Sequence, residues 1–237
     1  MTKLILFDID GTLVLTGGAG GRAMARALED LFDLRSGADS VSMPGRTDPW
    51  IVAQMTAAHG LQSDPAALRR FFDAYIERLA IEVHRPGPQK GVMPGVRPLL
   101  DALAVRGDAF LGLLTGNIES GARVKLEYFG LWHYFRCGAF GDDAEERNAL
   151  LGTAIARVAA CGGPEVAAAD VVIVGDTPLD VGVAVAGGAR SVAVATGDYD
   201  VDELKAAGAD AVLEDLSDLP AVLGAFGFPV ESPDGSR

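Results

Sequence analysis

The most constraining feature of the chain lies near its start, where an apolar run over residues 4–7 leads directly into Asp8 and Asp10. A short apolar run without polar alternation is typical of a strand buried on both faces, as in a parallel sheet. Open α/β sheets bind their ligands at the carboxyl ends of such strands. Residues two apart in an extended chain point to the same side, so both carboxylates can face one ligand. The alternative is a strand end that carries two solvated aspartates.

Two further predicted strands also end in polar groups. Residues 109–114 form an apolar run that ends in Thr115, and residues 171–174 form another that leads to Asp176. Segments with helical spacing separate these strands, and such alternation predicts an α/β fold. We therefore expect a Rossmann-like parallel sheet with helices on both faces, which brings the three polar strand ends to one edge.

A helical insertion is predicted between the first two of these strands. Apolar residues recur at helical spacing from residue 22 to residue 84, and Asp48 and Asp64, each followed by proline, are typical N-cap residues. Glycines and breaker residues flank the insertion and predict hinges. The expected organisation is a core domain of residues 1–15 and 92–226, a helical cap domain with its hinges of residues 16–91, and a C-terminal tail of residues 227–237.

Composition restricts the possible partners. The chain has 237 residues, of which 49% are hydrophobic, enough for a sizeable core, and a formal net charge of −13. Nucleic-acid binding requires clustered cations, so this charge argues against it. No apolar run approaches the ~20 residues that a membrane-spanning helix needs. We expect a cytoplasmic protein, a monomer or homodimer, whose partner is a small molecule.

The acidic strand ends favour a hard cation. Asp8, Asp10 and Asp176 offer carboxylate oxygens, which suit Mg²⁺. Asp180 follows Asp176 by four residues, about one helical turn. It can bind the metal directly, bind it through water, or orient one of the metal's other ligands.

The same edge offers groups that bind an anion. Thr115 supplies a hydroxyl, and Gly116 and Asn117 supply backbone N–H groups where a predicted helix begins. Arg147, near the start of the helix that precedes the third strand, can contact phosphate oxygens bidentately. A cation and oxyanion donors around a carboxylate fit phosphoryl transfer through an aspartyl-phosphate.

These segments resemble the motifs of the haloacid dehalogenase superfamily. The similar stretches are DIDGT at 8–12, LLTGN at 113–117 and GDTPLD at 175–180, in that order along the chain. The resemblance extends from about Lys3 to Leu223, and the insertion resembles the helical cap of that superfamily.

The resemblance implies a role for each site residue. Asp8 would be the nucleophile and Asp10 the acid and base, while Thr115 and Arg147 would hold the phosphoryl oxygens. Arg147 stands where the superfamily most often has lysine; Arg157 is the second choice, and a surface salt bridge is the alternative role of Arg147. The implied Mg²⁺ ligands are Asp8, the backbone carbonyl of Asp10, and Asp176, with Asp180 nearby.

Asp10 also distinguishes between reactions. In the dehalogenases of the superfamily the matching position is usually not aspartate, because no leaving alcohol needs a proton, so Asp10 favours a phosphatase. We expect hydrolysis of a small phosphorylated metabolite; a β-phosphoglucomutase-like phosphomutase is the main alternative, followed by a dehalogenase or a non-catalytic binding domain. Residues 43–48 resemble the cap loop of phosphoglycolate phosphatases and β-phosphoglucomutases. Arg46 in this loop would bind a substrate carboxylate or second phosphate, or else pair with Asp48.

Overall fold

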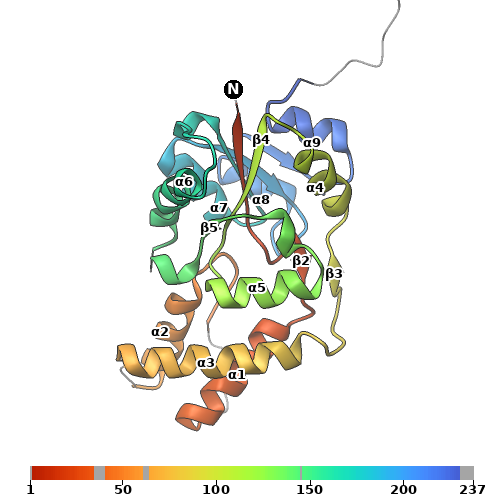
Figure 1. The fold of residues 1–237 in the computed structure, drawn as a ribbon. Helices are drawn as coiled ribbons and strands as arrows, with labels where there is room; N and C mark the ends of the chain where they lie inside the picture. Colours follow the sequence, from red (N-terminus) through yellow and green to blue (C-terminus); the bar gives the residue numbers. More distant parts are fainter. Residues whose placement is uncertain (1, 35–40, 61–63, 145, 230–237) are drawn as a thin grey trace, which may run out of the picture.

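The computed structural model describes residues 2–34, 41–60, 64–144 and 146–229. Its centre is a six-stranded parallel sheet, as the alternation of strands and helices predicts (Figure 1). Across the sheet the strands are β5 (Gly138–Ala139), β4 (Ala109–Leu114), β1 (Lys3–Phe7), β6 (Val171–Gly175), β7 (Arg190–Val194) and β8 (Ala211–Leu213).

Strand β1 lies in the middle of the sheet, between β4 and β6, and its residues Leu4 to Phe7 have no exposed surface. The expectation of a strand buried on both faces is therefore confirmed. Phe7 lies beside Leu113 of β4 and Val174 of β6. This register brings the carboxyl ends of the three strands level, so the polar residues that follow them leave the sheet at one edge.

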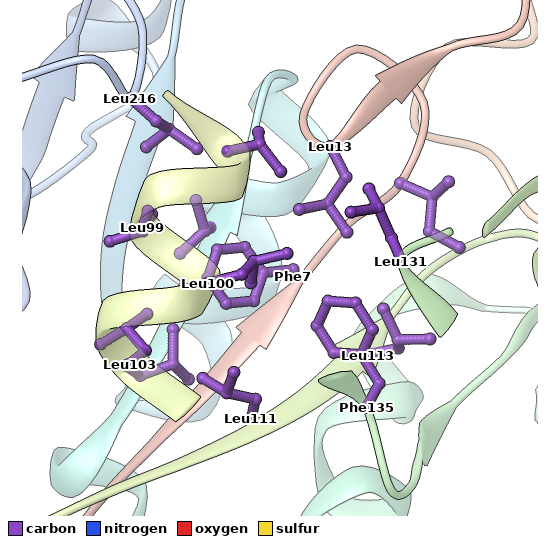
Figure 2. Packing of buried hydrophobic residues seen from close by; sticks show 14 of the residues in the cluster. Phe7, Leu13, Leu99, Leu100, Leu103, Leu111, Leu113, Leu131, Phe135 and Leu216 are labelled. Carbon is purple, nitrogen blue, oxygen red and sulfur yellow. The ribbon is translucent and has the colours of Figure 1, made fainter. Parts of the chain in front are cut away.

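Helices cover both faces of the sheet. Ile5 and Phe7 pack on one face, where Figure 2 shows Phe7 beside Leu100 of α4, while Leu4 and Leu6 pack on the other. This alternation along β1 follows from the pleat of a strand. The first face is covered by α4 (Val96–Ala104), α5 (Glu119–Tyr128) and α9 (Leu219–Ala225), and the second by α6 (Leu150–Ala160) and α7 (Pro178–Gly187). Helix α8 (Val201–Ala206) packs beside β7.

Three helices form a separate cluster at the carboxyl edge of the sheet, which is the lower end in Figure 1. They are α1 (Ala19–Phe32), α2 (Asp48–Ala58) and α3 (Pro65–Glu82). Their shared core includes Leu28, Met55, Phe71 and Tyr75, and Ile118 at the start of α5 packs against it. We call these three helices and the loop 43–47 the cap.

The two segments that join the cap to the sheet run side by side. Strand β2 (Val14–Leu15) pairs antiparallel with β3 (Gly91–Val92). Beyond this pair, a Cβ on Gly87 would lie 2.1 Å from the Gly17 carbonyl oxygen, so the two backbones touch. Two-residue strands have no periodicity, and sequence patterns do not predict this pair.

An ion-pair cluster lies where the cap meets these connections. Glu82, at the end of α3, has a buried carboxylate that contacts Arg22 and Arg26 of α1 and Arg85 of the returning segment. The hydrogen bond from Arg22 is the main reason that the pKa of Glu82 is lowered.

Some predicted boundaries need correction. The N-cap of α2 is Thr47, whose hydroxyl accepts from the Trp50 amide at 3.3 Å, and Asp48 is the first residue of the helix. Arg147 lies in a 3₁₀ turn, Arg147–Ala149, that precedes α6. Phe228 is buried in the core, beyond the expected boundary at residue 226, and residues 230–237 lie outside the described part of the chain. No described helix combines the length and apolar character that crossing a membrane requires.

Candidate active site

The carboxyl ends of β1, β4 and β6 open into a cavity of about 260 Å³ that the cap covers. The sheet edge and the cap contribute to its walls in comparable measure. Of the residues that the sequence singled out, the cavity is lined by Asp8, Asp10, Arg46, Gly116, Asn117, Arg147 and Asp176. Thr115 and Asp180 are fully or almost fully buried and contact these residues.

Asp8 follows β1 directly and is 5% exposed. Burial raises its pKa to about 6, although the guanidinium of Arg147 acts in the opposite direction. The Arg147 Nη2 atom is 3.2 Å from Asp8 Oδ1. The side chain of Thr115 also acts to lower this pKa. Asp8 is thus a buried carboxylate that lies beside Arg147 and faces the cavity.

Three buried carboxyl groups meet at this edge. Oxygen atoms of Asp8, Asp176 and Asp180 lie within 4.8 Å of one another, close enough to hold one metal ion. Burial, followed by the charges of Asp180 and Asp8, raises the pKa of Asp176 well above its usual value. Three carboxylates with one arginine among them repel one another unless a further cation or a bound proton is present. Their oxygen donors and small spacing fit a divalent ion such as Mg²⁺.

Asp176 requires glycine on two sides. A Cβ on Gly11 would lie 2.3 Å from its Oδ2 atom, and a Cβ on Gly197 only 1.8 Å. Any larger residue would displace the carboxylate. The Thr12 hydroxyl donates to its Oδ1 atom at 3.0 Å. Thr12 belongs to the first motif, and its contact spans 164 residues of sequence.

Asp180 is held mainly by its neighbours. Its Oδ2 atom accepts from the Thr177 amide at 3.1 Å and from the Thr177 hydroxyl at 2.7 Å, and its Oδ1 atom accepts from Arg147. Both oxygens are therefore engaged within the protein. This arrangement suits a residue that orients Arg147 beside the metal site.

Arg147 connects the sheet edge with the cap. Its guanidinium contacts Asp8 and Asp180, and its Nη1 atom donates to the Gly45 carbonyl oxygen of the cap loop at 2.9 Å. Its side chain is 7% exposed, which excludes the alternative of a surface salt bridge. Arg157, the second choice from sequence, pairs with Asp143 and does not line the cavity.

Asp10 has a partner that the motifs do not reveal. Lys125 of α5 donates from Nζ to Asp10 Oδ2 at 2.5 Å and to Asn117 Oδ1 at 2.6 Å. Asn117 Nδ2 donates to the same Asp10 oxygen and to Thr115 Oγ1, both at 2.9 Å. One hydrogen-bonded network therefore links Lys125, Asp10, Asn117 and Thr115.

Sequence reasoning did not select Lys125, although a signal is present. Lys125 lies on the same helical face as Gly121 and Ala122, at the i+3 and i+4 spacing that marks the buried side of α5. A lysine at a core position of an amphipathic helix needs a buried partner. Here that partner is 115 residues away in sequence.

The cap loop is docked on the end of β4. The Asp48 amide donates to the Gly116 carbonyl oxygen at 2.7 Å, and the Asp48 carboxylate accepts from the Ile118 amide at 2.9 Å. Burial raises the pKa of Asp48 to about 7. Within the described residues Arg46 forms no ion pair with Asp48; its guanidinium stacks on the Trp50 ring at 4.4 Å, beside the cavity.

Comparison with known proteins gives a consistent result. A family model described as haloacid dehalogenase-like hydrolase matches residues 5–194. A phosphoglycolate phosphatase from Rhodospirillum rubrum is 34% identical over 241 residues, which cover 100% of this chain and 95% of that protein.

Solved structures show the same fold. The structure of CbbY from Rhodobacter sphaeroides in complex with phosphate is similar with a TM-score of 0.70 and 23% identity, and covers 92% of this chain and 96% of that one. The structure of a putative β-phosphoglucomutase from Thermotoga maritima has a TM-score of 0.59 and 20% identity, with coverages of 94% and 99%. The family model matches most of this chain, and its three motifs meet in the cavity. The chain therefore belongs to the haloacid dehalogenase-like hydrolases, in the branch that resembles phosphoglycolate phosphatases.

Proposed function

We propose that this protein is a Mg²⁺-dependent phosphatase that hydrolyses a small phosphorylated metabolite through an aspartyl-phosphate on Asp8. The observation that carries the proposal is the pair of unlike carboxylates after β1. Asp8 is buried beside Arg147 and two further carboxyl groups, whereas Asp10 is bonded to Lys125 and has a 40% exposed side chain. Two carboxylates in such different surroundings suit two different roles.

In the first step, the Asp8 carboxylate attacks phosphorus and the bond to the leaving oxygen breaks. Arg147 and the Thr115 hydroxyl lie beside Asp8, where they can hold the phosphoryl oxygens. Asp10 donates a proton to the leaving alkoxide, so the alcohol departs neutral. In the second step Asp10 takes a proton from water, which attacks phosphorus, releases inorganic phosphate and restores Asp8.

Asp8, Asp176 and the backbone carbonyl of Asp10 would hold Mg²⁺, with Asp180 adjacent. The ion would offset the charge that accumulates where an anionic nucleophile meets an anionic substrate. The raised pKa values of Asp8 and Asp176 support this assignment, because these buried carboxyl groups have too few positive neighbours to stay ionised at low cost.

The cap supports a small substrate. The cavity of about 260 Å³ is bordered by the docked loop 43–48, and Arg46 is among the residues that line it. The relative from Rhodospirillum rubrum is a phosphoglycolate phosphatase, which suits an arginine placed to bind a carboxylate or a second phosphate. We therefore propose that Arg46 binds an anionic group of the substrate away from the ester.

A phosphomutase remains the alternative activity. It would use the same phosphoenzyme, transferring the phosphoryl group to a sugar hydroxyl in place of water. Incubation with a sugar monophosphate and its bisphosphate distinguishes the two: a phosphatase releases inorganic phosphate, whereas a mutase interconverts isomers.

The nucleophile can be tested with Asp8→Asn and p-nitrophenyl phosphate in the presence of Mg²⁺. The amide cannot form the phosphoenzyme, so turnover should fall by at least about 10⁴-fold. The matched control is Asp202→Asn on α8. This side chain is exposed, and its ion pair with Lys205 is long, at 3.9 Å. Turnover retained in Asp8→Asn would rule out the aspartyl-phosphate route. If the wild type turned over no phosphate ester, the remaining candidate functions would be a dehalogenase and a non-catalytic binding domain.

A further inference from the structure

Two buried side-chain atoms of cavity-lining residues have no hydrogen-bond partner among the described residues: Arg147 Nε at the sheet edge and the Tyr75 hydroxyl in the cap. Tyr75 of α3 is fully buried and lines the cavity, and its hydroxyl has no hydrogen-bond partner among the described residues. Its ring is held in place, stacked on Phe71 with ring centroids 6.4 Å apart and packed beside Gly121 of α5. A buried hydroxyl without a partner is destabilising, because it has lost its hydrogen bonds to water and gained none in the protein. Such a group at the wall of a cavity points to a ligand atom that completes its bonding.

A second donor faces the same point. A methyl group at Gly20 of α1 would lie 3.5 Å from Lys125 Nζ and 3.8 Å from Tyr75 Oη. An ammonium group has three donors, and within the described residues Lys125 uses two of them, for Asp10 and for Asn117. The space beside Gly20 is therefore bordered by a free ammonium N–H and a free phenol. It adjoins Asp10, the residue that would face the leaving oxygen.

The surrounding charges select the chemistry of the occupant. Burial, followed by the charges of Asp48 and Asp10, raises the pKa of Tyr75, so both carboxylates act on this point. Lys125 is the ammonium at this point, and it is already paired with Asp10. A substrate carboxylate would add a third negative group here. A neutral hydroxyl can accept from Lys125 and share a hydrogen bond with Tyr75 without that repulsion.

We propose that Lys125 Nζ and Tyr75 Oη form a subsite for a hydroxyl oxygen on the leaving alcohol, so that the preferred substrates are hydroxyalkyl phosphates of the polyol or sugar type. This inference rests on the proposed phosphatase function and specifies its substrate class. It adds two residues, one from α3 of the cap and one from α5 of the core, that the motifs of the sequence do not indicate. The subsite is complete only while cap and core are in contact.

The test compares two esters that differ by one hydroxyl, 2-hydroxyethyl phosphate and ethyl phosphate. The wild type should prefer the hydroxylated ester. Tyr75→Phe should lower kcat/KM for 2-hydroxyethyl phosphate about tenfold, the equivalent of one hydrogen bond of about 1.4 kcal/mol, and leave ethyl phosphate within about twofold. The melting temperature should stay equal or rise, because the variant loses only an unpaired hydroxyl. A structural role alone would affect both esters equally.

A second variant fills the space while leaving both polar groups intact. Gly20→Ala should be well tolerated, because position 20 is helical and the new methyl group makes only ordinary contacts. It should lower kcat/KM for 2-hydroxyethyl phosphate as Tyr75→Phe does. The matched control is Gly152→Ala in α6, which is exposed, away from the cavity and has open space around it.

Three outcomes separate the possibilities. Equal effects on both esters in Tyr75→Phe and Gly20→Ala, with ethyl phosphate still hydrolysed, would overturn the subsite and leave the phosphatase intact. If the two variants lose kcat/KM selectively for phosphoglycolate and not for 2-hydroxyethyl phosphate, the subsite binds a carboxylate and the proposal of a hydroxyl is wrong. If the wild type hydrolyses none of the three esters, the phosphatase proposal itself fails, and the subsite with it.

Discussion

The two walls of the cavity differ in how far their polar groups are satisfied within the protein. On the sheet side, Arg147 bonds to both Asp8 and Asp180, and its Nε atom alone lacks a hydrogen-bond partner within the described part of the guanidinium's surroundings. On the cap side, the Arg46 guanidinium stacks on Trp50 and the Tyr75 hydroxyl has no partner among the described residues.

This difference suggests a division of labour. Preorganised groups on the sheet side suit the phosphoryl group, which is common to all substrates and whose charge must be met in the transition state. Groups left without protein partners on the cap side suit the part of the substrate that varies. Substitutions on the sheet side should therefore lower kcat for every ester, and substitutions on the cap side should alter the choice among esters.

The largest expected effect comes from Arg147→Met. This change removes the guanidinium beside Asp8 and leaves Asp180 without its charged partner. Because the contact acts on the transferring group, kcat should fall about 100- to 1,000-fold for all esters alike. The measurement is steady-state kinetics on ethyl phosphate and 2-hydroxyethyl phosphate. Arg123→Met, which removes an exposed arginine paired with Glu127, is the control. A loss confined to one ester would contradict the assignment of Arg147 to the sheet side.

A smaller and selective effect is expected for Arg46→Ala on the cap side. Loss of one exposed cation should raise KM about tenfold for a substrate with a carboxylate or second phosphate, since a charged hydrogen bond contributes about 1.5–3 kcal/mol when well shielded and less when exposed. Ethyl phosphate should be unaffected. Kinetics over phosphoglycolate and sugar phosphates check this, with Arg69→Ala on the exposed face of α3 as the control. If kcat/KM is unchanged over that panel, Arg46 has no role in binding.

The smallest expected effect concerns the contact between the two sides. The pKa of Asp48 is raised by burial to about 7, so the docked loop binds a proton more tightly than the unfolded chain does. Its contribution to stability is therefore present at low pH and is lost as pH rises from about 4 to about 7. Asp48→Asn keeps a side-chain acceptor for the Ile118 amide but cannot titrate.

This variant should reduce the fall in melting temperature between pH 5 and pH 8 by a few degrees, measured with saturating Mg²⁺ to hold the other carboxylates constant. Asp202→Asn should keep the wild-type pH dependence. An unchanged pH dependence in Asp48→Asn would show that this carboxyl group does not titrate in the docked loop.

The sheet side could be predicted from sequence because strand ends are local signals. The apolar run before Asp8 and those before Thr115 and Asp176 each indicate a buried strand, and parallel strands bring their ends to one edge. The register of β1 with β4 and β6 confirms that arrangement. Arg147 could be placed because it stands in order between the second and third motifs.

The contacts that α5 and the cap make around the cavity could not be predicted to the same depth. The contact of Lys125 with Asp10 spans 115 residues and depends on how α5 lies over the strand ends. The position of Tyr75 depends on the packing of α3 against α5, which local sequence patterns do not predict. Thr47 and Asp48 are both good capping residues, and only the contact of Asp48 with Ile118 shows why Thr47 is the N-cap.

The most direct test of the central claim is to trap the phosphoenzyme. The enzyme with Mg²⁺ is mixed with a ³²P-labelled phosphate ester and quenched in acid within one turnover, and the labelled peptide is identified by mass spectrometry. We predict label on the peptide that contains Asp8, at up to one phosphoryl group per chain, and none in Asp8→Asn. Rapid phosphate release by the wild type with no labelled peptide, together with turnover in Asp8→Asn, would contradict the account.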